Sequence, residues 1–259
     1  AMDFGLDDKT ALVTGGGGNI GSEDCRTLAG EGAEIVVLDV DMDAAGAVVD
    51  DIHDDGGDAF AVECDITDRD DVSETIGEVR DETGGVDVLI NNAAFVDAQA
   101  QLKDYDDDVW DRDVAVNLDG AYNVSREVFP AMCERGWGRV VSMSSMAGWY
   151  GGFGQASYSA TKAALIGLGK TMALEGAQRG VTSNVIAPSI VLADLADMEP
   201  EELEAFAPMF ERIRQATPMR TLGRESDVAN LIAYLSSEQA SYVTGQVIGV
   251  TGGIDLFTF

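Results

Sequence analysis

The sequence predicts an α/β protein in which a parallel sheet of seven strands is covered by helices on both faces. Short runs of β-branched residues alternate with longer stretches of helical hydrophobic spacing along the 259 residues. Several of the short runs are apolar throughout, which is typical of parallel strands buried on both faces. This alternation defines a doubly wound sheet. Because no Pro- or Ser-rich linker interrupts it, we expect one domain over residues 1–259.

The predicted strands leave room for a helix between most neighbours. In chain order they are Thr10–Thr14, Glu34–Leu38, Ala59–Cys64, Val86–Ile90, Arg139–Met143, Ser183–Ile186 and Gln246–Val250. Between the third and fourth strands, Val72, Ile76 and Val79 have the spacing of one helix face. We also expect a long helix at about residues 107–134 and another that begins near Tyr158.

The net charge is strongly negative. The chain has 47 acidic and 16 basic side chains and a formal net charge of −31. Such a surface repels phosphate backbones and anionic headgroups, so we expect neither a nucleic acid nor a membrane surface as partner. We interpret the acidity as adaptation to a salt-rich, halophilic cytoplasm, where about 1 M salt shortens the screening length to about 3 Å. An ordinary acidic surface is the alternative.

Several other features exclude whole classes of function. No apolar run of about 18 residues and no leader pattern is present, so a cytoplasmic location is expected. The only histidine, His53, lies in an acidic stretch, which argues against Ser-His-Asp hydrolysis, Cys-His proteolysis and a His-ligated metal. Cys25, Cys64 and Cys133 are odd in number and widely spaced, so we expect reduced, structural thiols and no metal site.

A glycine-rich turn, Thr14 to Gly21, follows the first strand and opens a helix. Glycines at such a turn let backbone N–H groups and the helix N-terminus approach a pyrophosphate. An ordinary strand-to-helix turn is the alternative, but the position within a βαβ unit favours a Rossmann-like dinucleotide site. The candidate cofactor contacts in this turn are Gly15, Gly18, Asn19 and Ile20.

Two acidic residues at strand ends are candidates for binding the adenosine half of a dinucleotide. Asp39 ends the second strand, near the offset at which a carboxylate meets the adenosine ribose. A carboxylate there accepts from ribose hydroxyls and repels a 2′-phosphate, which favours NAD over NADP. Asp65, followed by Ile66, is a candidate to face adenine, and a helix cap before Asp68 is its alternative role.

A Ser, Tyr and Lys group supplies candidate catalytic residues. Ser145 follows the fifth strand, and Tyr158 and Lys162 lie four residues apart on one helix face. An ammonium group beside a phenol stabilises the phenolate, so we expect the pKa of Tyr158 to fall from its usual value near 10. Ser145 is placed to donate to a substrate oxygen. Taken alone, the Tyr-x-x-x-Lys spacing occurs often by chance and favours an exposed helical pair.

Taken together, these motifs resemble those of the short-chain dehydrogenase/reductase family over essentially the whole chain. The matching segments are Thr14 to Gly21, Asn91-Asn92-Ala93-Ala94, Asn117, Ser145, Tyr158 and Lys162. The resemblance implies that Tyr158 is the acid/base, that Lys162 also holds the nicotinamide ribose, and that Ser145 orients the substrate. It further implies that Asn117 holds a water that links Lys162 to solvent. The other contacts with the NAD cofactor that it implies are Asn92, Ala93, Pro188 and Val191.

The chain departs from the family pattern at five positions. Asn19 replaces the middle glycine of the turn, where we expect asparagine to tolerate a left-handed conformation. Ala94 and Ser189 replace glycines. Ala193 replaces a threonine that commonly contacts the nicotinamide amide, so one contact is lost, and Thr251 replaces a common aspartate.

The family resemblance also bears on substrate and assembly. Residues 191–217 correspond to a substrate lid, here rich in apolar side chains, which favours a cyclic, aryl or acyl-bearing secondary alcohol or ketone. The alternatives are a sugar (glucose-type) dehydrogenase, a 3-hydroxyacyl/3-oxoacyl reductase, and a non-catalytic NAD-binding sensor. The apolar stripe of the lid is equally consistent with packing on the sheet. A homotetramer is expected, with a dimer as second choice.

Overall fold

The computed structural model describes residues 4–96 and 100–256. Seven strands form one sheet of order β3-β2-β1-β4-β5-β6-β7, and all neighbours are parallel. The strands are β1 Thr10–Thr14, β2 Glu34–Asp39, β3 Asp58–Glu63, β4 Val88–Asn91, β5 Gly138–Met143, β6 Val181–Pro188 and β7 Val247–Val250. Each predicted strand is therefore confirmed, with bounds that differ by two residues at most.

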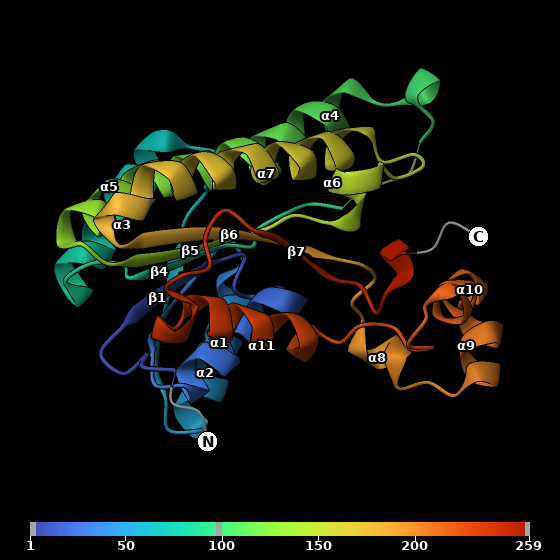
Figure 1. Ribbon diagram of the computed structural model, residues 1–259, viewed down its shortest axis with the longest axis horizontal. Coiled ribbons are helices and arrows are strands. Elements are labelled where there is room, and N and C mark those ends of the chain that lie inside the picture. Colours follow the sequence, from blue (N-terminus) through green and yellow to red (C-terminus); the bar gives the residue numbers. More distant parts are fainter. Residues whose placement is uncertain (1–3, 97–99, 257–259) are drawn as a thin grey trace.

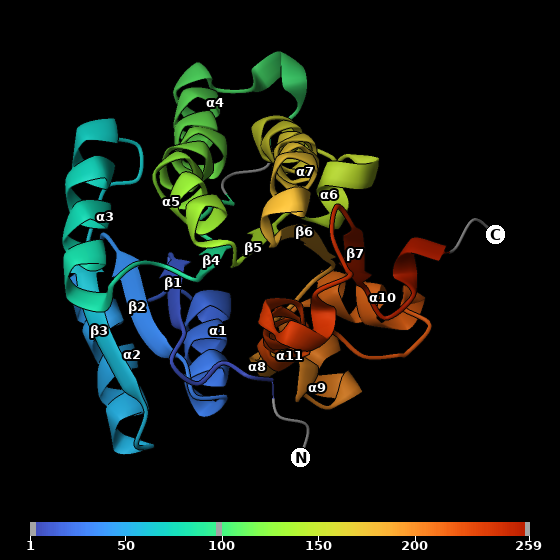
Figure 2. The ribbon, with the colours of Figure 1, turned by 60° about the vertical axis from the view of Figure 1, so that its left-hand side comes forward.

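Helices cover both faces of the sheet (Figures 1 and 2). Helices α3, α5 and α7 pack on one face, and α1, α2 and α11 pack on the other. The helices are α1 Asn19–Gly30, α2 Met42–Asp54, α3 Arg69–Thr83, α4 Asp107–Val114, α5 Ala121–Arg135, α6 Met146–Tyr150, α7 Ala156–Gly176, α8 Ala193–Ala196, α9 Pro200–Phe206, α10 Pro208–Ala216 and α11 Glu225–Ser236. The predicted long helix is α4 and α5 joined by a π-helical turn, Ala115–Gly120.

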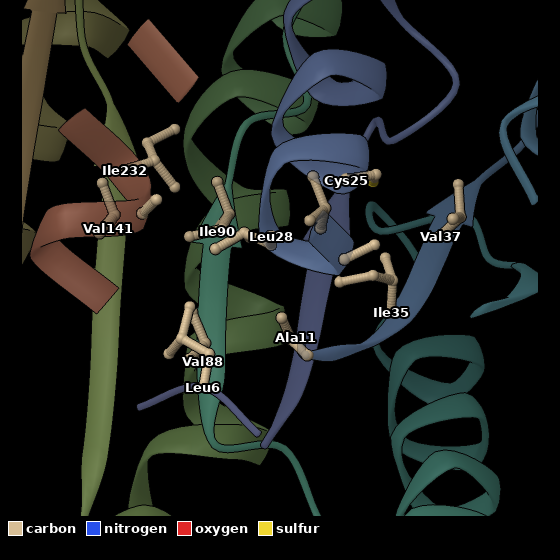
Figure 3. Packing of buried hydrophobic residues seen from close by; sticks show 14 of the residues in the cluster. Leu6, Ala11, Cys25, Leu28, Ile35, Val37, Val88, Ile90, Val141 and Ile232 are labelled. Carbon is tan, nitrogen blue, oxygen red and sulfur yellow. The ribbon is translucent and has the colours of Figure 1, made fainter. Parts of the chain in front are cut away.

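The core consists of two apolar layers separated by the sheet. Figure 3 shows the layer between the sheet and helices α1 and α11, where Leu28 and Ile232 meet strand residues such as Val88. Cys25 is fully buried here, and Cys64 lies in the other layer. Burial raises the pKa of the Cys64 thiol to about 11 and that of Cys25 further. These thiols therefore stay protonated at neutral pH, in agreement with the structural role predicted for them.

Aspartates set several of the helix starts. Asp41, Asp68 and Asp106 are the N-cap residues of α2, α3 and α4, and each side chain accepts hydrogen bonds from backbone N–H groups of the first turn. A carboxylate at this position satisfies donors that have no partner within the helix and complements the helix dipole. Part of the aspartate excess therefore has a local structural function.

The order of the strands locates the functional end of the molecule. Strand β1 pairs with β2 on one side and β4 on the other. Strands β2 and β3 extend the sheet to one side of β1, and strands β4 to β7 extend it to the other, so the order of strands reverses at β1. In open parallel sheets, ligands bind beyond the carboxyl ends of the strands at this switch point.

Among the described residues, no helix has the length and apolar character needed to cross a membrane. Within the same ranges, no group of three His, Cys, Asp or Glu side chains is arranged to hold a metal ion.

Candidate active site

A cavity of about 1360 Å³ opens at the carboxyl ends of the strands. The segments that follow β1 to β6 form one part of its wall. The end of α4 with the π-helical turn, the first turns of α7, helix α10 and Ile254 form the rest. Of the residues selected from the sequence, all but Asn117 line it: Gly15, Gly18, Asn19, Ile20, Asp39, Asp65, Ile66, Asn92, Ala93, Ser145, Tyr158, Lys162, Pro188 and Val191. The volume exceeds the usual range for single small-ligand pockets, about 300–1000 Å³, so a cofactor and a substrate fit together.

The glycine turn is packed so closely that side chains are excluded. A Cβ atom on Gly21 would lie 2.2 Å from the carbonyl oxygen of Gly15 and 2.7 Å from Asn92 Nδ2. Gly15 has φ +63°, and a Cβ there would lie 2.8 Å from the Cα of Ala93. Helix α1 begins after Gly18 without a side-chain cap. Its first N–H groups are therefore available to an anion, and the turn fits the diphosphate of a dinucleotide.

Asn19 does not need the left-handed conformation that we expected it to tolerate. It is the first residue of α1, and the described non-glycine residues with positive φ are Asp8 and Arg220. The replacement of glycine is therefore accommodated by ordinary helical geometry.

Asp39 is fixed at the edge of the cavity by backbone donors. Its Oδ2 accepts from the N–H of Gly17 at 2.9 Å, and its Oδ1 accepts from the N–H of Asp41 at 3.0 Å. Each carboxylate oxygen has a second acceptor site. The carboxylate therefore joins the glycine turn to β2 and keeps acceptor capacity for ribose hydroxyls.

Asp65 is not the helix cap that the sequence offered as its alternative role, and its contact with adenine stays a prediction. It lines the cavity, and its Oδ1 accepts from both the backbone N–H and the hydroxyl of Thr67, at 2.9 and 2.7 Å. Asp65 therefore stabilises the turn before α3, whereas the N-cap of that helix is Asp68.

A cluster of hydrogen bonds joins the ends of β1 and β4. The Asn92 amide donates to the carbonyl oxygens of Thr14 and Gly15, both at 3.1 Å. The Thr14 hydroxyl accepts from the backbone N–H groups of Asn92 and Ala93, also at 3.1 Å. Asn92 and Ala93 therefore support the cofactor turn as well as line the cavity. The contribution of the Thr14 hydroxyl was not predictable from local sequence, because its hydrogen bonds join segments far apart in the chain.

Lys162 is buried at the centre of the site and bonded to β5. Its Nζ donates to the carbonyl oxygen of Met143 at 2.6 Å, and its own carbonyl oxygen accepts from the Ser144 hydroxyl at 2.7 Å. The side chain is 2% exposed, and burial lowers its pKa to about 8. Lys162 therefore changes its charge close to physiological pH.

The pKa of Tyr158 is raised, whereas its position beside Lys162 led us to expect a lowered pKa. Burial raises its pKa above the usual value, and a hydrogen bond with Ser145 opposes this increase without cancelling it. The Lys162 ammonium is bonded to the Met143 carbonyl and lies 5.7 Å from the centre of the Tyr158 ring. Desolvation of the phenol is therefore the main influence on its pKa.

Asn117 lies in the π-helical turn, fully buried behind the cavity wall. Its Oδ1 accepts from the N–H of Phe95 at 2.7 Å, and its Nδ2 donates to the Phe95 carbonyl at 3.0 Å. The side chain therefore holds the segment after β4 against the long helix. π-helical turns often occur at functional sites, but the proton relay implied for Asn117 stays a prediction.

The lid contributes apolar residues to the cavity and also packs on itself. Met209, Phe210 and Ile213 line the cavity, together with Phe95 and Val96 from the segment after β4. Leu203, by contrast, is fully buried within the lid. Part of the apolar stripe therefore lines the cavity and part is buried among the helices of the same segment, whereas its packing on the sheet stays an alternative. At Ala193, the N–H donates to Glu225 Oε2 at 3.0 Å, which fixes the start of α8.

The fold and the site together define a class of protein. A doubly wound sheet with a glycine turn at its switch point, and a Ser, Tyr and Lys group in the adjoining cavity, is the arrangement of a nucleotide-dependent oxidoreductase. The profile of the family described as enoyl-(acyl carrier protein) reductase matches residues 17–255. The chain belongs to the short-chain dehydrogenase/reductase family, whose members act on CH–OH and keto groups.

Individual relatives cover 95% or more of the chain. A 3-oxoacyl-(acyl-carrier-protein) reductase of Staphylococcus epidermidis is 36% identical over 248 residues, which span 95% of this chain and 99% of the relative. The structure of a candidate gluconate dehydrogenase from Agrobacterium tumefaciens superposes with a TM-score of 0.89 at 29% identity and covers 100% of both chains. A xylitol dehydrogenase with bound NAD+ gives a TM-score of 0.88 at 29% identity, over 96% of this chain and 100% of the other.

Proposed function

We propose that the protein is an NAD-dependent oxidoreductase that transfers hydride between nicotinamide C4 and the carbon of a secondary alcohol or ketone. The observation that carries this proposal is the convergence of Tyr158, Ser145 and Lys162 on the cavity that the glycine turn and Asp39 also line. When bound, the nicotinamide accepts or supplies the hydride; the protein supplies binding, orientation and proton transfer.

Tyr158 is the proton donor and acceptor of the proposed reaction. In the direction of oxidation, the phenolate oxygen of Tyr158 takes the proton of the substrate hydroxyl as hydride leaves the carbon. In reduction, the protonated phenol returns that proton to the carbonyl oxygen. The raised pKa of Tyr158 keeps the phenol protonated at neutral pH, which suits reduction. Ser145 binds the same substrate oxygen, and a protonated Lys162 favours the phenolate during oxidation.

The substrate class that the cavity favours is an apolar or acyl-bearing secondary alcohol. Met209, Phe210 and Ile213 line the cavity together with Phe95 and Val96, so a substrate with apolar groups buries them favourably. The relative named as a 3-oxoacyl-(acyl-carrier-protein) reductase supports an acyl thioester in particular. The dehydrogenases named for xylitol and gluconate keep a polyol or sugar acid as the second candidate.

A substrate panel tests the proposed reaction. Cyclic and aryl secondary alcohols, 3-hydroxyacyl thioesters, and sugars including glucose and xylitol are supplied with NAD+, and NADH absorbance is followed at low and high salt. We expect turnover of at least one apolar or acyl-bearing alcohol and the highest kcat/KM in that class. Turnover of sugars alone would contradict the substrate class, and NADH formation from none of them would contradict the reaction.

The Asp39→Asn variant tests the choice of cofactor. Asparagine keeps an acceptor for the Gly17 N–H but removes the charge that repels a 2′-phosphate. We expect the ratio of kcat/KM for NAD+ to that for NADP+ to fall by about tenfold to a hundredfold, since one lost charge interaction corresponds to about 1–3 kcal/mol. A wild-type enzyme that prefers NADP+ would contradict the proposal. Asp50→Asn, at an exposed carboxylate on α2 that does not line the cavity, is the matched control.

A further inference from the structure

Helix α7, which carries Tyr158 and Lys162, begins without a cap of its own. Its N-cap residue, Gln155, makes no capping hydrogen bond through its side chain, and its first turn contains no acidic residue. The first N–H groups of a helix have no partner within it and create a partial positive charge. The start of α7 therefore depends on groups from elsewhere in the molecule.

Asp113, in the last turn of α4, supplies such a group. Its side chain is 1% exposed, and its Oδ2 accepts a hydrogen bond from the Ser157 hydroxyl in the first turn of α7. The Tyr105 hydroxyl lies 2.6 Å from Ser157 Oγ. Since the Ser157 proton points to the carboxylate, Tyr105 donates to Ser157. The other oxygen of Asp113 lies 3.3 Å from the Arg112 guanidinium.

The two turns of α7 that carry functional residues are anchored differently. Lys162, in the second turn, is bonded to β5 through both its side chain and its carbonyl oxygen. Tyr158 lies one turn earlier, directly after Ser157. Asp113, Ser157 and Tyr105 do not line the cavity themselves. Asp113 is connected to the cavity through Ser157 and the backbone of α7, and also through Arg112, which lies on the cavity wall.

We infer that Asp113 is a positioning residue for the acid/base Tyr158: its buried carboxylate, brought by α4, holds Ser157 and the first turn of α7 in place. The inference rests on the proposed function of Tyr158. Figure 1 shows α4 and α7 side by side, and they are in contact along this segment. A carboxylate is suited to this role because it both accepts a hydrogen bond from the Ser157 hydroxyl and complements the positive end of the helix.

Kinetics of Asp113→Ala and Ser157→Ala test the inference. We expect kcat to fall by about tenfold to a hundredfold, because a small misplacement of a reacting group has effects of this size. The Kd for NAD+ is expected to stay unchanged, since the cofactor turn and Lys162 keep their own bonds. Asp113→Asn, which can still accept from Ser157, is expected to recover most of the activity. Asp24→Asn is the matched control, a buried carboxyl on α1 that has no hydrogen-bond partner within the described ranges.

Hydrogen–deuterium exchange of the cofactor-free protein gives a second readout that needs no substrate. We expect the amides of residues 159–162 to exchange faster in Asp113→Ala than in the wild type, with the rest of α7 unchanged. If Asp113→Ala does not fold, Ser157→Ala and Tyr105→Phe, which each remove one hydroxyl, carry both measurements.

Three outcomes would overturn the inference. They are an unchanged kcat in the folded variants, a loss of NAD+ affinity as large as the loss of kcat, and unchanged exchange at the start of α7. A wild-type protein without turnover would instead contradict the proposed function, and the exchange comparison would still decide whether Asp113 holds the helix.

Discussion

Burial acts in opposite directions on the pKa values of the two central groups of the site. It raises the pKa of Tyr158 and lowers that of Lys162, because in each case it disfavours the charged form. Both side chains are therefore biased toward neutrality. A neutral phenol is the form that donates a proton to a carbonyl, whereas oxidation of an alcohol requires the phenolate. We expect substrate oxidation to be favoured at higher pH and reduction at lower pH.

The Tyr158→Phe variant tests the acid/base role directly. Phenylalanine keeps the ring and removes the hydroxyl, so we expect kcat to fall by at least about 10²-fold, the lower range for general acid–base catalysis. NAD+ affinity, measured by quenching of intrinsic fluorescence, is expected to stay unchanged. Tyr242→Phe, at a fully exposed tyrosine, is the control. Retained turnover in Tyr158→Phe would favour a site in which tyrosine takes no part in proton transfer.

The buried Lys162 makes a specific prediction about stability and pH. Its pKa is about 8 in the folded protein and 10.5 in an exposed lysine. Below about pH 8 the lysine is charged in both states, so the full cost of burying the charge opposes folding. As pH rises toward 10.5, the folded protein has lost this proton while the unfolded chain still binds it, and the penalty decreases.

The Lys162→Met variant isolates this effect. Below pH 8 we expect the variant to be the more stable protein, because it buries no charge. As pH rises to 10.5, we expect the free energy of unfolding of the wild type to increase relative to that of the variant by up to about 3 kcal/mol. Denaturant unfolding of the two cofactor-free proteins at several pH values measures the difference. Titration of other groups is common to both and cancels. A difference that does not change with pH would show that Lys162 is not titrating in this range.

At the scale of elements, the glycine turn and α1 form a unit that tolerates no side chain at Gly21. We expect Gly21→Ala to abolish detectable NAD+ binding and lower the melting temperature, because the added Cβ would meet Gly15 O and Asn92 Nδ2 inside contact distance. Gly46→Ala is the matched control. Gly46 lies inside α2 with no atom within 4 Å of its added Cβ, so alanine is expected to stabilise the helix by up to about 1 kcal/mol. Equal effects of the two substitutions would contradict this interpretation of the turn.

The elements differ in how far local sequence determines them. The strands were predictable because runs such as VVL in β2 are buried on both faces, and a hydrophobic run bounded by polar residues marks such a strand. The π-helical turn at Ala115–Gly120 was not predictable, since apolar spacing continues through it. Residue Val86 is buried like a strand residue, yet β4 begins at Val88, because burial alone does not determine ladder pairing.

The candidate site shows the same division. The spacing of Tyr158 and Lys162 and the position of Asp39 after β2 are local patterns, and the structure brings all three to one cavity. The bonds that orient the site instead join distant segments. Asn117 binds Phe95, Ser157 binds Asp113, and Lys162 binds the Met143 carbonyl. Such bonds depend on the tertiary arrangement. The burial of the Tyr158 phenol depends on it too, which is why the pKa of Tyr158 was predicted in the wrong direction.

For the whole molecule, the excess of acid cannot be neutralised within the chain. Even if each of the 16 basic side chains paired with one carboxylate, the net charge of −31 would remain. Some acidic side chains cap helices. Others are exposed to solvent and lie next to one another along a helix face. Glu74, Glu78 and Glu82 on α3 are exposed and spaced four residues apart, an arrangement that is destabilising for like charges. Exposed apolar residues on α5 and α7, Tyr122 and Leu174, are consistent with the homotetramer expected from the sequence.

Assembly is therefore expected to depend on salt. Raising ionic strength from about 0.1 M to about 1 M shortens the Debye length from about 10 Å to about 3 Å, which removes most repulsion between acidic protomers. Sedimentation velocity and melting temperature across a sodium chloride series are expected to show a tetramer at high salt and smaller, less stable species at low salt. A triple variant with Gln at positions 74, 78 and 82 is expected to need less salt for the same melting temperature, because it carries three fewer negative charges. A tetramer that persists without salt, with undiminished activity, would show that the acidic surface is not an adaptation to salt.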